Sequence, residues 1–227
     1  METTKRYRHE WKHAISYADL LSIRSRLRAV ADLDPHASGG SYTIRSLYFD
    51  SPTDRALRQK VDGVDMREKF RIRCYNNDLS FIQLEKKSKL RDLGTKYHTR
   101  LTPEQVDGIV QGDLSWMMGT DDALIQELYC KMHYQQLRPK TIVEYTREPY
   151  VYAPGNVRVT FDYDLRTGMG STDFLNAGCT LVPAGDAPIL LEVKWDDFLP
   201  SIIRDCVQTP GRRVTAFSKY AQCRIYG

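Results

Sequence analysis

One stretch, Asp65-Met-Arg-Glu-Lys-Phe-Arg-Ile-Arg-Cys-Tyr75, alternates its residue types with a period of two. This period predicts a β-strand, because successive side chains of a strand point to opposite faces of the sheet. One face carries Arg67, Lys69, Arg71 and Arg73, and the other carries Met66, Glu68, Phe70, Ile72 and Cys74. A half-buried strand ordinarily mixes polar residues on its solvent face, so a face made only of cations requires an explanation.

Other segments show the same two-residue period, which makes about eight strands in all. They are Arg6–Ser16, Tyr42–Asp50, Ser80–Lys89, Gly94–Leu101, Lys140–Tyr150, Val157–Asp164 and Pro188–Trp195. Most neighbours along the chain are joined by turns or short connections, which favours antiparallel pairing.

Helical patterns lie between and after these strands. A helix is predicted over Tyr17–Ala31 behind Ser16 as N-cap, and another over Pro103–Val110 behind Thr102, where Gln105 closes a capping box. Amphipathic stretches that could cover a sheet follow at Thr120–Gln136, Phe198–Gln208 and Thr215–Ile225. The class predicted is α+β, with a large antiparallel sheet and helices around it.

Composition and loop lengths favour a single domain over residues 1–227. The chain is 41% hydrophobic, which is enough to bury a core, and none of its Gly- and Pro-containing loops is long enough to be a linker. It has no apolar run of about 18 residues and no apolar segment near its charged start, so neither a membrane span nor a secretory signal is expected.

The cysteines indicate the compartment. Their number is odd and their spacing irregular, so neither a disulfide framework nor a zinc ribbon is suggested. We therefore expect buried free thiols in a cytoplasmic protein, at Cys74, Cys130, Cys179, Cys206 and Cys223.

The net charge of +4 says little by itself, but the charges cluster on strand faces. Beyond the opening stretch, these faces are Arg6, Arg8, Glu10 and Lys12; Gln83, Glu85, Lys87 and Lys89; Lys96, His98 and Arg100; Arg158, Thr160, Asp162 and Asp164; and Glu192 with Lys194. Like charges on neighbouring strands repel each other unless carboxylates, water or a bound polyanion offset them.

Two interpretations of these faces stay open from the pattern alone. They could be the ordinary solvated side of a sheet, or they could bind a phosphate-rich ligand together with its divalent metal ion. Guanidinium groups suit phosphate oxygens, lysines supply point charge, and carboxylates suit Mg²⁺ or Mn²⁺. The periodicity also does not decide between an open groove and the inside of a closed barrel.

Common catalytic motifs are missing from the sequence. It contains no phosphate-binding loop ending in Gly-Lys-Ser/Thr, no His-Glu-x-x-His, and no Gly-x-Ser-x-Gly elbow. The histidines form no cluster with the spacing of metal ligands. Nucleophilic side-chain catalysis is therefore unsupported, whereas metal-assisted phosphoryl transfer needs only positioning and charge stabilisation.

Short motifs along nearly the whole chain resemble those of the VTC (vacuolar transporter chaperone) catalytic domain, a polyphosphate polymerase of the CYTH-like triphosphate tunnel metalloenzymes. In chain order they are Arg8-His-Glu-Trp-Lys12, Ser46-Leu-Tyr-Phe-Asp50, Arg71-Ile-Arg-Cys-Tyr75, Leu84-Glu-Lys-Lys87, Gly94-Thr-Lys96, Glu144-Tyr-Thr-Arg147, Arg158-Val-Thr-Phe-Asp162, Leu191-Glu-Val-Lys194 and Phe217-Ser-Lys-Tyr220. Each motif is weak alone, but their shared order is specific.

The resemblance implies an eight-stranded antiparallel β-barrel whose lumen holds triphosphate or a growing polyphosphate chain. Polar faces would then point inward and apolar faces would meet surrounding helices. The phosphate-binding set implied is Arg8, Lys12, Arg71, Arg73, Lys87, Lys96, Arg147, Arg158, Ser218 and Lys219.

The resemblance also implies catalytic and metal-binding roles. The catalytic set would be Lys219, Arg71, Arg73 and Glu192; the metal, Mn²⁺ or Mg²⁺, would be held by Glu192 with help from Glu10 and Asp162. Glu85 and Glu144 could also assist the metal or simply pair with cations. In the cyclase and triphosphatase branch the first strand reads Glu-x-Glu-x-Lys, and here Arg8 replaces the first acid, which favours the VTC branch.

Three functions follow as hypotheses. The first is an ATP-dependent polyphosphate polymerase, a phosphotransferase that acts on ATP and polyphosphate. The second is a tripolyphosphatase or nucleoside triphosphatase that uses the same residues, and the third is a polyphosphate-binding module without catalysis. Nucleic acid is not expected as a partner, because no aromatic stacking motif of the RNA-binding type is found. A membrane-associated partner protein cannot be read from the sequence.

Overall fold

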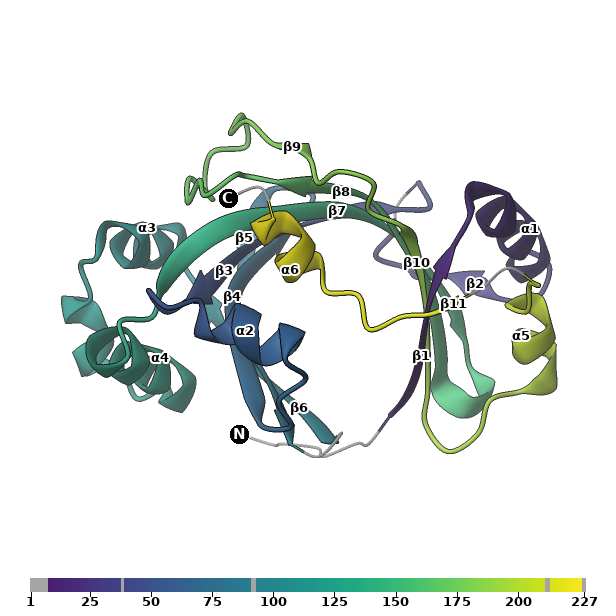
Figure 1. Ribbon diagram of the computed structural model, residues 1–227, viewed down its shortest axis with the longest axis horizontal. Helices are drawn as coiled ribbons and strands as arrows, with labels where there is room; N and C mark the ends of the chain where they lie inside the picture. The colour runs from purple at the N-terminus through teal and green to yellow at the C-terminus, as the bar shows by residue number, and fades with distance from the viewer. Residues whose placement is uncertain (1–7, 38, 91–92, 211–212, 226–227) are drawn as a thin grey trace.

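The computed structural model describes residues 8–37, 39–90, 93–210 and 213–225. One antiparallel sheet dominates it, with six α-helices packed around the strands (Figure 1). Its long strands are β1 (His9–Ile15), β3 (Tyr42–Asp50), β4 (Arg67–Tyr75), β5 (Asp78–Leu90), β6 (Leu93–Leu101), β7 (Arg138–Tyr152), β8 (Val157–Thr167) and β10 (Ile189–Trp195). The short strands are β2 (Asp32–Leu33), β9 (Val182–Pro183) and β11 (Arg213–Val214).

These long strands correspond to the eight segments predicted from the period of two. The first predicted strand began at Arg6, and its residues 6 and 7 lie outside the described residues. The strand order is β11-β1-β10-β8-β7-β3-β4-β5-β6, and all pairs are antiparallel as predicted. The α+β class with a large antiparallel sheet is confirmed.

The predicted closed barrel is not confirmed. Among the described residues, no ladder joins β6 at one end of the sheet to β1 or β11 at the other. The sheet nevertheless curls strongly, as Figure 1 shows, and register shifts in three of its ladders, at Tyr48, Arg73 and Glu144, help it to bend. The result is an open, curved sheet with a concave inner face.

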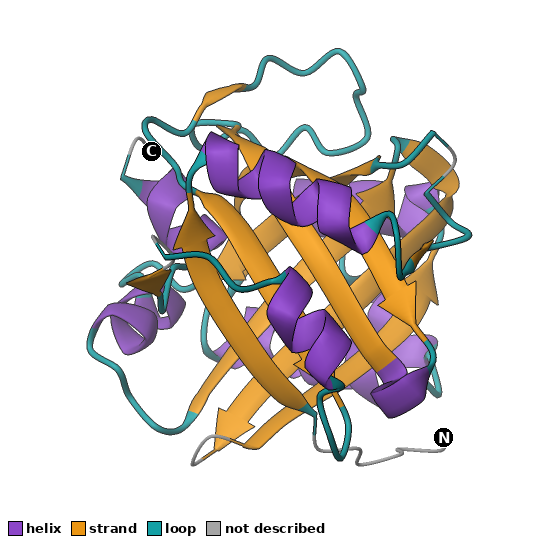
Figure 2. Cartoon of the chain, turned by 90° about the vertical axis from the view of Figure 1, so that its right-hand side faces the viewer, coloured by secondary structure: helices purple, strands orange, loops and turns teal. Residues whose placement is uncertain are grey.

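Helices cover the outer face of the sheet in two groups, one on each side of Figure 1, and Figure 2 shows helices lying across the strands. Behind β3 to β6 lie α3 (Pro103–Gln111), the 3₁₀ helix η1 (Ser115–Gly119) and α4 (Ala123–Tyr134). Phe70, Ile72 and Leu84 from the strands are buried in this core together with Val106 and Leu128 from the helices. The apolar face of the opening stretch thus points outward to helices, as the inverted alternation predicted.

The second outer core lies behind β1, β7, β8 and β10. Here α1 (Tyr17–Leu27) and α5 (Ser201–Cys206) bury Leu20, Ile23 and Ile203 against Phe161 and Val193 of the strands. Figure 1 shows both helices on the side of the sheet away from its concave face. The 3₁₀ helix η2 (Pro154–Asn156) forms the turn between β7 and β8.

Local sequence signals determine where two of these helices begin. Ser16 accepts a hydrogen bond from the backbone of Asp19, whose carboxylate accepts one from the backbone of Ser16. Thr102 and Gln105 form the same reciprocal pair at the start of α3, where Pro103 is the first helical residue. The capping box at Thr102 and the N-cap at Ser16 were predicted, and both helices begin at the predicted residue.

The short helix α6 (Lys219–Arg224) takes a position that periodicity did not predict. It packs on the inner face of the sheet, where Tyr220 and Cys223 are buried against Ile44, Val143 and Tyr145. This third core is the apolar part of the inner face (Figure 1). Tyr220 also donates a hydrogen bond of 2.7 Å to Asp50, which anchors α6 to the end of β3.

A further helix, α2 (Arg55–Val61), was missed in the sequence. It buries no residue, and Asp54 before it adopts a left-handed conformation with φ of 55° without a side-chain cap. Neither an apolar stripe nor a cap therefore marks it. Its first turn is held instead by Asp50, which accepts backbone hydrogen bonds from Ala56 and Leu57.

The five cysteines are free, as predicted. Cys74, Cys206 and Cys223 are buried, but Cys130 is exposed and Cys179 is half-buried, so the expectation of burial was wrong for these two. Burial raises the pKa of the Cys223 thiol to about 12, which keeps it unreactive. No helix in the described part of the chain is long and apolar enough to span a membrane.

Candidate phosphate-binding site

Charged residues of β1, β4, β5, β8 and β10 meet on the concave side of the sheet. Strand register places Lys69 opposite Lys87, and Lys87 opposite Lys96. On the other half of the sheet, Arg147 lies opposite Asp162, and Glu192 lies opposite both Thr160 and Lys12. The alternation within each strand is thereby converted into one continuous charged surface.

The curl of the sheet brings its two halves to face each other. The pKa of Lys87 on β5 is lowered, first by partial removal from bulk water and then by the charges around it, including a lowering effect of Lys194 and an opposing effect of Glu10. Lys194 and Glu10 belong to β10 and β1, which are separated from β5 in the sheet by β8, β7, β3 and β4. Electrostatic contact across this separation requires a concave surface.

Asp162 lies at the centre of one charged group, and only 1% of it is exposed. Its two oxygens accept hydrogen bonds from the Arg147 guanidinium at 2.6 and 2.7 Å, and Lys219 Nζ lies 2.6 Å from Oδ2. Burial by itself would raise the pKa of Asp162, but Arg147 and Lys219 outweigh it and lower the pKa. Asp162 is therefore a buried anion with all its oxygens engaged.

Glu192 lies beside this pair on the neighbouring strand and is also buried. Its nearest cation is Lys12, at 2.9 Å, and Lys194, Arg147 and Lys219 follow at 3.5, 3.8 and 3.9 Å. Burial opposes ionisation, yet these cations hold the pKa of Glu192 well below its usual range. We call Asp162, Glu192, Lys12, Arg147 and Lys219 the carboxylate cluster.

Glu85 organises the arginines of the opening stretch. Arg71 approaches its Oε2 at 2.6 Å, Arg73 lies at 3.7 Å, and Lys96 contacts its other oxygen at 2.6 Å. These cations outweigh the effect of burial and lower the pKa of Glu85 far below normal. The carboxylate fixes the guanidinium groups in place on the inner face, so that their N–H donors are in position for a phosphate group.

Tyr48 on β3 was not singled out in the sequence, yet it contacts the same arginines. Its hydroxyl accepts a hydrogen bond of 2.9 Å from Arg71, and its ring stacks on Tyr220 of α6. Burial disfavours the phenolate, but Arg71, Arg73 and Lys69 outweigh this and lower the pKa of Tyr48 to about 8. In the β3–β4 ladder Ser46 lies opposite Arg73 and Tyr48 lies opposite Arg71. The period of two on β3 could therefore have predicted that Tyr48 lies beside these arginines.

Lys69 is the second residue that the predicted site lacked. Its Nζ donates to Ser218 Oγ at 3.3 Å and lies 5.6 Å from the ring centre of Tyr220. Ser218 caps α6 and precedes Lys219, so this contact links β4 to the carboxylate cluster on the opposite half of the sheet. Lys69 shares a strand face with Arg71 and Arg73, which is the signal that could have identified it.

Some predicted residues lie apart from these groups. Arg8 pairs with Asp196 at 2.9 Å and bonds the Asn156 carbonyl at the β7–β8 turn. Arg158 pairs with Asp34 at 2.9 Å and donates to Tyr42 at 2.9 Å. Both guanidinium groups are held by the protein at the margin of the inner face.

The two secondary acids also differ in position. Glu10 is exposed and lies 3.6 Å from Lys194, on the inner face beside Glu192. Glu144 pairs with Arg45, whose guanidinium also binds the backbone carbonyls of Asn176 and Ala177. This pair alternates with the inward Val143 and Tyr145, so Glu144 faces outward, away from the charged inner face.

The residues fit a divalent metal that is bound together with phosphate. In the described residues no cluster of three or more His, Cys, Asp or Glu side chains forms a complete cage. Mg²⁺-type ions often use only one or two carboxylates and complete their shell with phosphate oxygens and water. Glu192 suits this role better than Asp162, because its cation contacts are longer and Lys12 and Lys194 are partly exposed.

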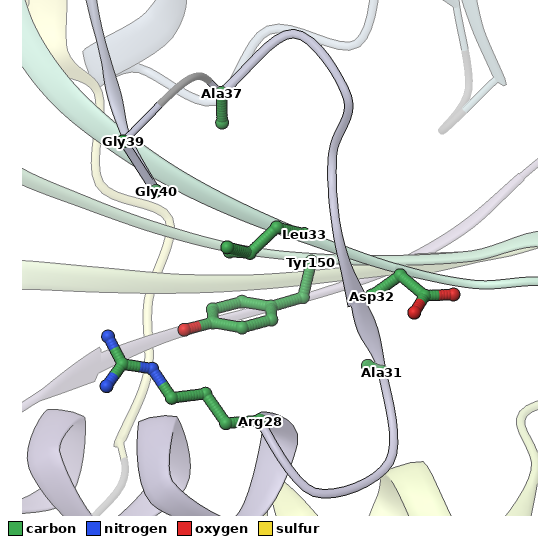
Figure 3. Close-up of a pocket in the computed structure, with 8 residues that line it drawn as sticks. All are labelled: Arg28, Ala31, Asp32, Leu33, Ala37, Gly39, Gly40 and Tyr150. Atoms are coloured by element: carbon green, nitrogen blue, oxygen red, sulfur yellow. The ribbon is translucent and has the colours of Figure 1, made fainter.

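A separate hollow of about 490 Å³ lies outside this surface, between the end of α1 and β7 (Figure 3). Arg28, Asp32 and Tyr150 line it, and none of its lining residues belongs to the predicted site. Tyr150 packs in the outer core and donates to Glu148, which is itself bound by Arg24. This hollow therefore lies apart from the charged inner face.

A family comparison matches residues 7–225 to the VTC domain. The chain belongs to the VTC-domain family. A search of curated proteins gives no match. The resemblance stated from the motifs is confirmed over almost the full chain.

Solved structures share the fold of this VTC domain at low sequence identity. A Hippeastrum protein, described as a candidate adenylyl cyclase with a dominant triphosphatase activity, is 13% identical, with a TM-score of 0.52 and 96% of each chain covered. A candidate adenylate cyclase from Bacillus halodurans is 12% identical, with a TM-score of 0.51, and the match covers 83% of this chain and 80% of that one. These structures show that the VTC domain shares its fold with both proteins.

Proposed function

We propose that this VTC domain is a polyphosphate polymerase that transfers the γ-phosphoryl group of ATP to the end of a polyphosphate chain. The observation that carries the proposal is the convergence of Lys12, Arg147 and Lys219 around two buried carboxylates, opposite Arg71 and Arg73. Such a surface suits a linear string of phosphates and leaves one or two acids for a metal ion.

The reaction needs no side-chain nucleophile. A terminal phosphate oxygen of the chain attacks the γ-phosphorus of ATP in line, the bond from that phosphorus to the bridging oxygen breaks, and ADP leaves. Arg71, Arg73, Arg147 and Lys219 offset the charge on the equatorial oxygens, while Asp162 and Glu85 hold the cations in place. Mn²⁺ or Mg²⁺, when bound, supplies further charge stabilisation at the phosphate oxygens.

The test is incubation of the purified protein with ATP and Mn²⁺ or Mg²⁺, followed by a stained polyphosphate gel and an ADP assay. We expect chains to lengthen with one ADP released for each phosphate added. Glu192→Ala should abolish the product while the far-ultraviolet circular dichroism spectrum stays unchanged. Full activity in this variant would overturn the assignment of Glu192.

A second candidate is a tripolyphosphatase or nucleoside triphosphatase that uses water as the nucleophile. The shared fold with the Hippeastrum protein favours it, since that protein is described by its triphosphatase activity. Release of phosphate from tripolyphosphate without chain growth from ATP would select this reaction. Tight binding of polyphosphate without turnover under either metal would instead select a binding module.

A further inference from the structure

Asp50, the last residue of β3, is a fully buried carboxylate that the proposed reaction does not use. Its Oδ1 accepts hydrogen bonds from the backbone N–H groups of Ser51 and Ala56, each at 2.8 Å. Its Oδ2 accepts one from the backbone of Leu57 at 3.1 Å and one from the Tyr220 hydroxyl at 2.7 Å. Because a buried carboxylate that loses its donors is strongly disfavoured, Asp50 holds α2 and α6 in one arrangement.

Tyr220 contributes the hydrogen bond from α6. Burial, and after it the negative charge of Asp50, raises the pKa of Tyr220, so the phenol keeps its proton and acts as the donor. The same hydroxyl accepts a hydrogen bond of 3.1 Å from Arg224, which also donates to Asp54 at 2.9 Å. Helix α6 therefore holds the connection between β3 and α2 at two points.

The orientation of α6 also determines how two cations of the inner face lie relative to each other. Lys219 directly precedes Tyr220, and its Nζ lies 2.6 Å from Asp162. The ring of Tyr220 stacks on the ring of Tyr48 with centroids 5.0 Å apart, and Tyr48 accepts a hydrogen bond of 2.9 Å from Arg71. Tyr220 is thus connected to Lys219 through the backbone and to Arg71 through its ring.

We propose that Asp50 and Tyr220 are positioning residues, whose hydrogen bond fixes α6 so that Lys219 Nζ and the Arg71 guanidinium stay in register at the reacting phosphate. The inference rests on the proposed function for the roles of Lys219 and Arg71. Asp50 is 0% and Tyr220 1% exposed, so both act through other residues. Misplacing a reacting group by about 1 Å costs up to about a hundredfold in rate, whereas phosphate binding is shared among many cations. Loss of the hydrogen bond should therefore lower kcat more than it raises KM.

The test is Tyr220→Phe, which removes the hydroxyl and keeps the ring that stacks on Tyr48. It is preferred to Asp50→Asn, which would also release the first turn of α2. Steady-state kinetics with ATP and Mn²⁺ or Mg²⁺, followed by ADP release, should show kcat lowered by about tenfold and KM changed by less than about twofold. Tyr150→Phe is the matched control, because it removes an equally buried hydroxyl that donates to Glu148 at 2.6 Å in the outer core, and it should keep the full kcat.

A double-mutant cycle with Lys219→Ala separates positioning from a general loosening of the fold. If the hydroxyl acts by placing Lys219, Tyr220→Phe should change kcat by less than about twofold in the Lys219→Ala background. Backbone hydrogen exchange gives a measure that does not depend on catalysis. The amides of α6 should exchange faster in Tyr220→Phe and at the unaltered rate in Tyr150→Phe.

Three results would overturn the inference. The first is a full kcat in Tyr220→Phe, and the second is an equal loss of kcat in Tyr150→Phe, which would indicate general destabilisation. The third is a loss that persists undiminished in the Lys219→Ala background, because the hydroxyl would then act by a route other than Lys219.

The outcome is separable from that of the proposed function. If ATP yields no polymer but ATP or tripolyphosphate is hydrolysed, the polymerase assignment fails and the same comparison of kcat is made on hydrolysis, where the two cations face the same phosphates. If polymer forms and Tyr220→Phe keeps the full rate, the positioning role fails alone. If the unaltered protein turns over neither compound, the proposed function and the positioning role both fail.

Discussion

The carboxylate cluster differs in its charge balance from three lysines of the inner face, Lys60, Lys69 and Lys87, which we call the lysine cluster. In the first, Arg147 and Lys219 hold Asp162 at 2.6 Å, and Lys12 holds Glu192 at 2.9 Å. In the second, Lys60, Lys69 and Lys87 form no ion pair with an acid of the described residues, and loss of hydration is the main cause that lowers the pKa of each. In the first region the acids of the protein pair with the cations at short distance, and in the second they do not.

The difference indicates a division of labour. Paired cations in fixed positions are suited to the reacting phosphates, where geometry decides the rate. Under the proposed function, lysines on flexible stems would suit a chain that must bind and then advance by one unit, since point charges impose little orientation. The contact between Lys69 and Ser218, next to Lys219, is where the two regions meet.

The largest expected effect is on stability and comes from breaking the carboxylate cluster. Asp162→Asn removes a buried anion and leaves Arg147 and Lys219 without their main partner, which should lower the free energy of unfolding by about 3–5 kcal/mol. Urea denaturation measures this, and added tripolyphosphate should restore part of the loss by pairing with the freed cations. If the free energy of unfolding fell by less than about 1 kcal/mol, the ion pairs of Asp162 would not stabilise the fold as proposed.

The next effect concerns turnover. Lys219→Ala removes a cation next to the reacting phosphates and should lower the rate of ATP consumption by about a hundredfold or more. Asp162 keeps its two bonds from Arg147 in this variant, so the fold should persist. Arg204→Ala, which removes an exposed cation from α5, is the control and should retain the full rate.

A smaller effect is expected in the pH dependence of polyphosphate affinity, because Lys69 and Tyr48 lose protons near pH 8. Phosphate favours protonated Lys69, whose pKa is about 8 in the free protein, so above that pH binding must take up a proton and affinity must fall. Tyr48, also near 8, acts in the same direction because its phenolate repels phosphate, while Lys60, Arg67 and Lys87 surround the lysine as cations. We expect polyphosphate affinity to fall by up to about tenfold per pH unit between about pH 8 and about pH 9.5.

Variants assign this pH dependence to its groups. Lys69→Arg keeps a charge that does not titrate in this range, and Tyr48→Phe removes the phenol. Combined, they should flatten the profile measured by calorimetry. If affinity still fell with pH by the same amount in the combined variant, groups other than Lys69 and Tyr48 would be responsible. The two clusters would then not differ in their pH dependence through these residues.

The smallest expected effect concerns a buried hydroxyl group, that of Thr160, beside the carboxylate cluster. Thr160 lies opposite Glu192, is 4% exposed, and its hydroxyl has no hydrogen-bond partner among the described residues. Thr160→Val keeps the shape and removes an unsatisfied polar group, so stability should rise by about 1 kcal/mol. A loss of that size in urea denaturation would instead reveal a hydrogen bond to this hydroxyl.

Local patterns predicted most of the secondary structure, because its causes are local. Alternation located the eight long strands, and the capping residues Ser16 and Thr102 located the starts of α1 and α3. α2 escaped because its stabilising partner, Asp50, lies on β3 and no apolar stripe marks the helix. α6 was predicted as a helix, but its place on the inner face depends on Tyr220 reaching Asp50 across the fold.

The sequence by itself determined that cations alternate with apolar residues on several strands and that the motifs follow the VTC order. Only the tertiary structure decided which of those cations are already neutralised. Arg8, Arg158 and Glu144 were grouped with the site by motif, but each is held by a partner distant in sequence: Asp196, Asp34 and Arg45. The physical reason is that a side chain's spacing along a strand fixes its face, whereas its charge balance depends on whichever groups the curled sheet brings within a few ångströms.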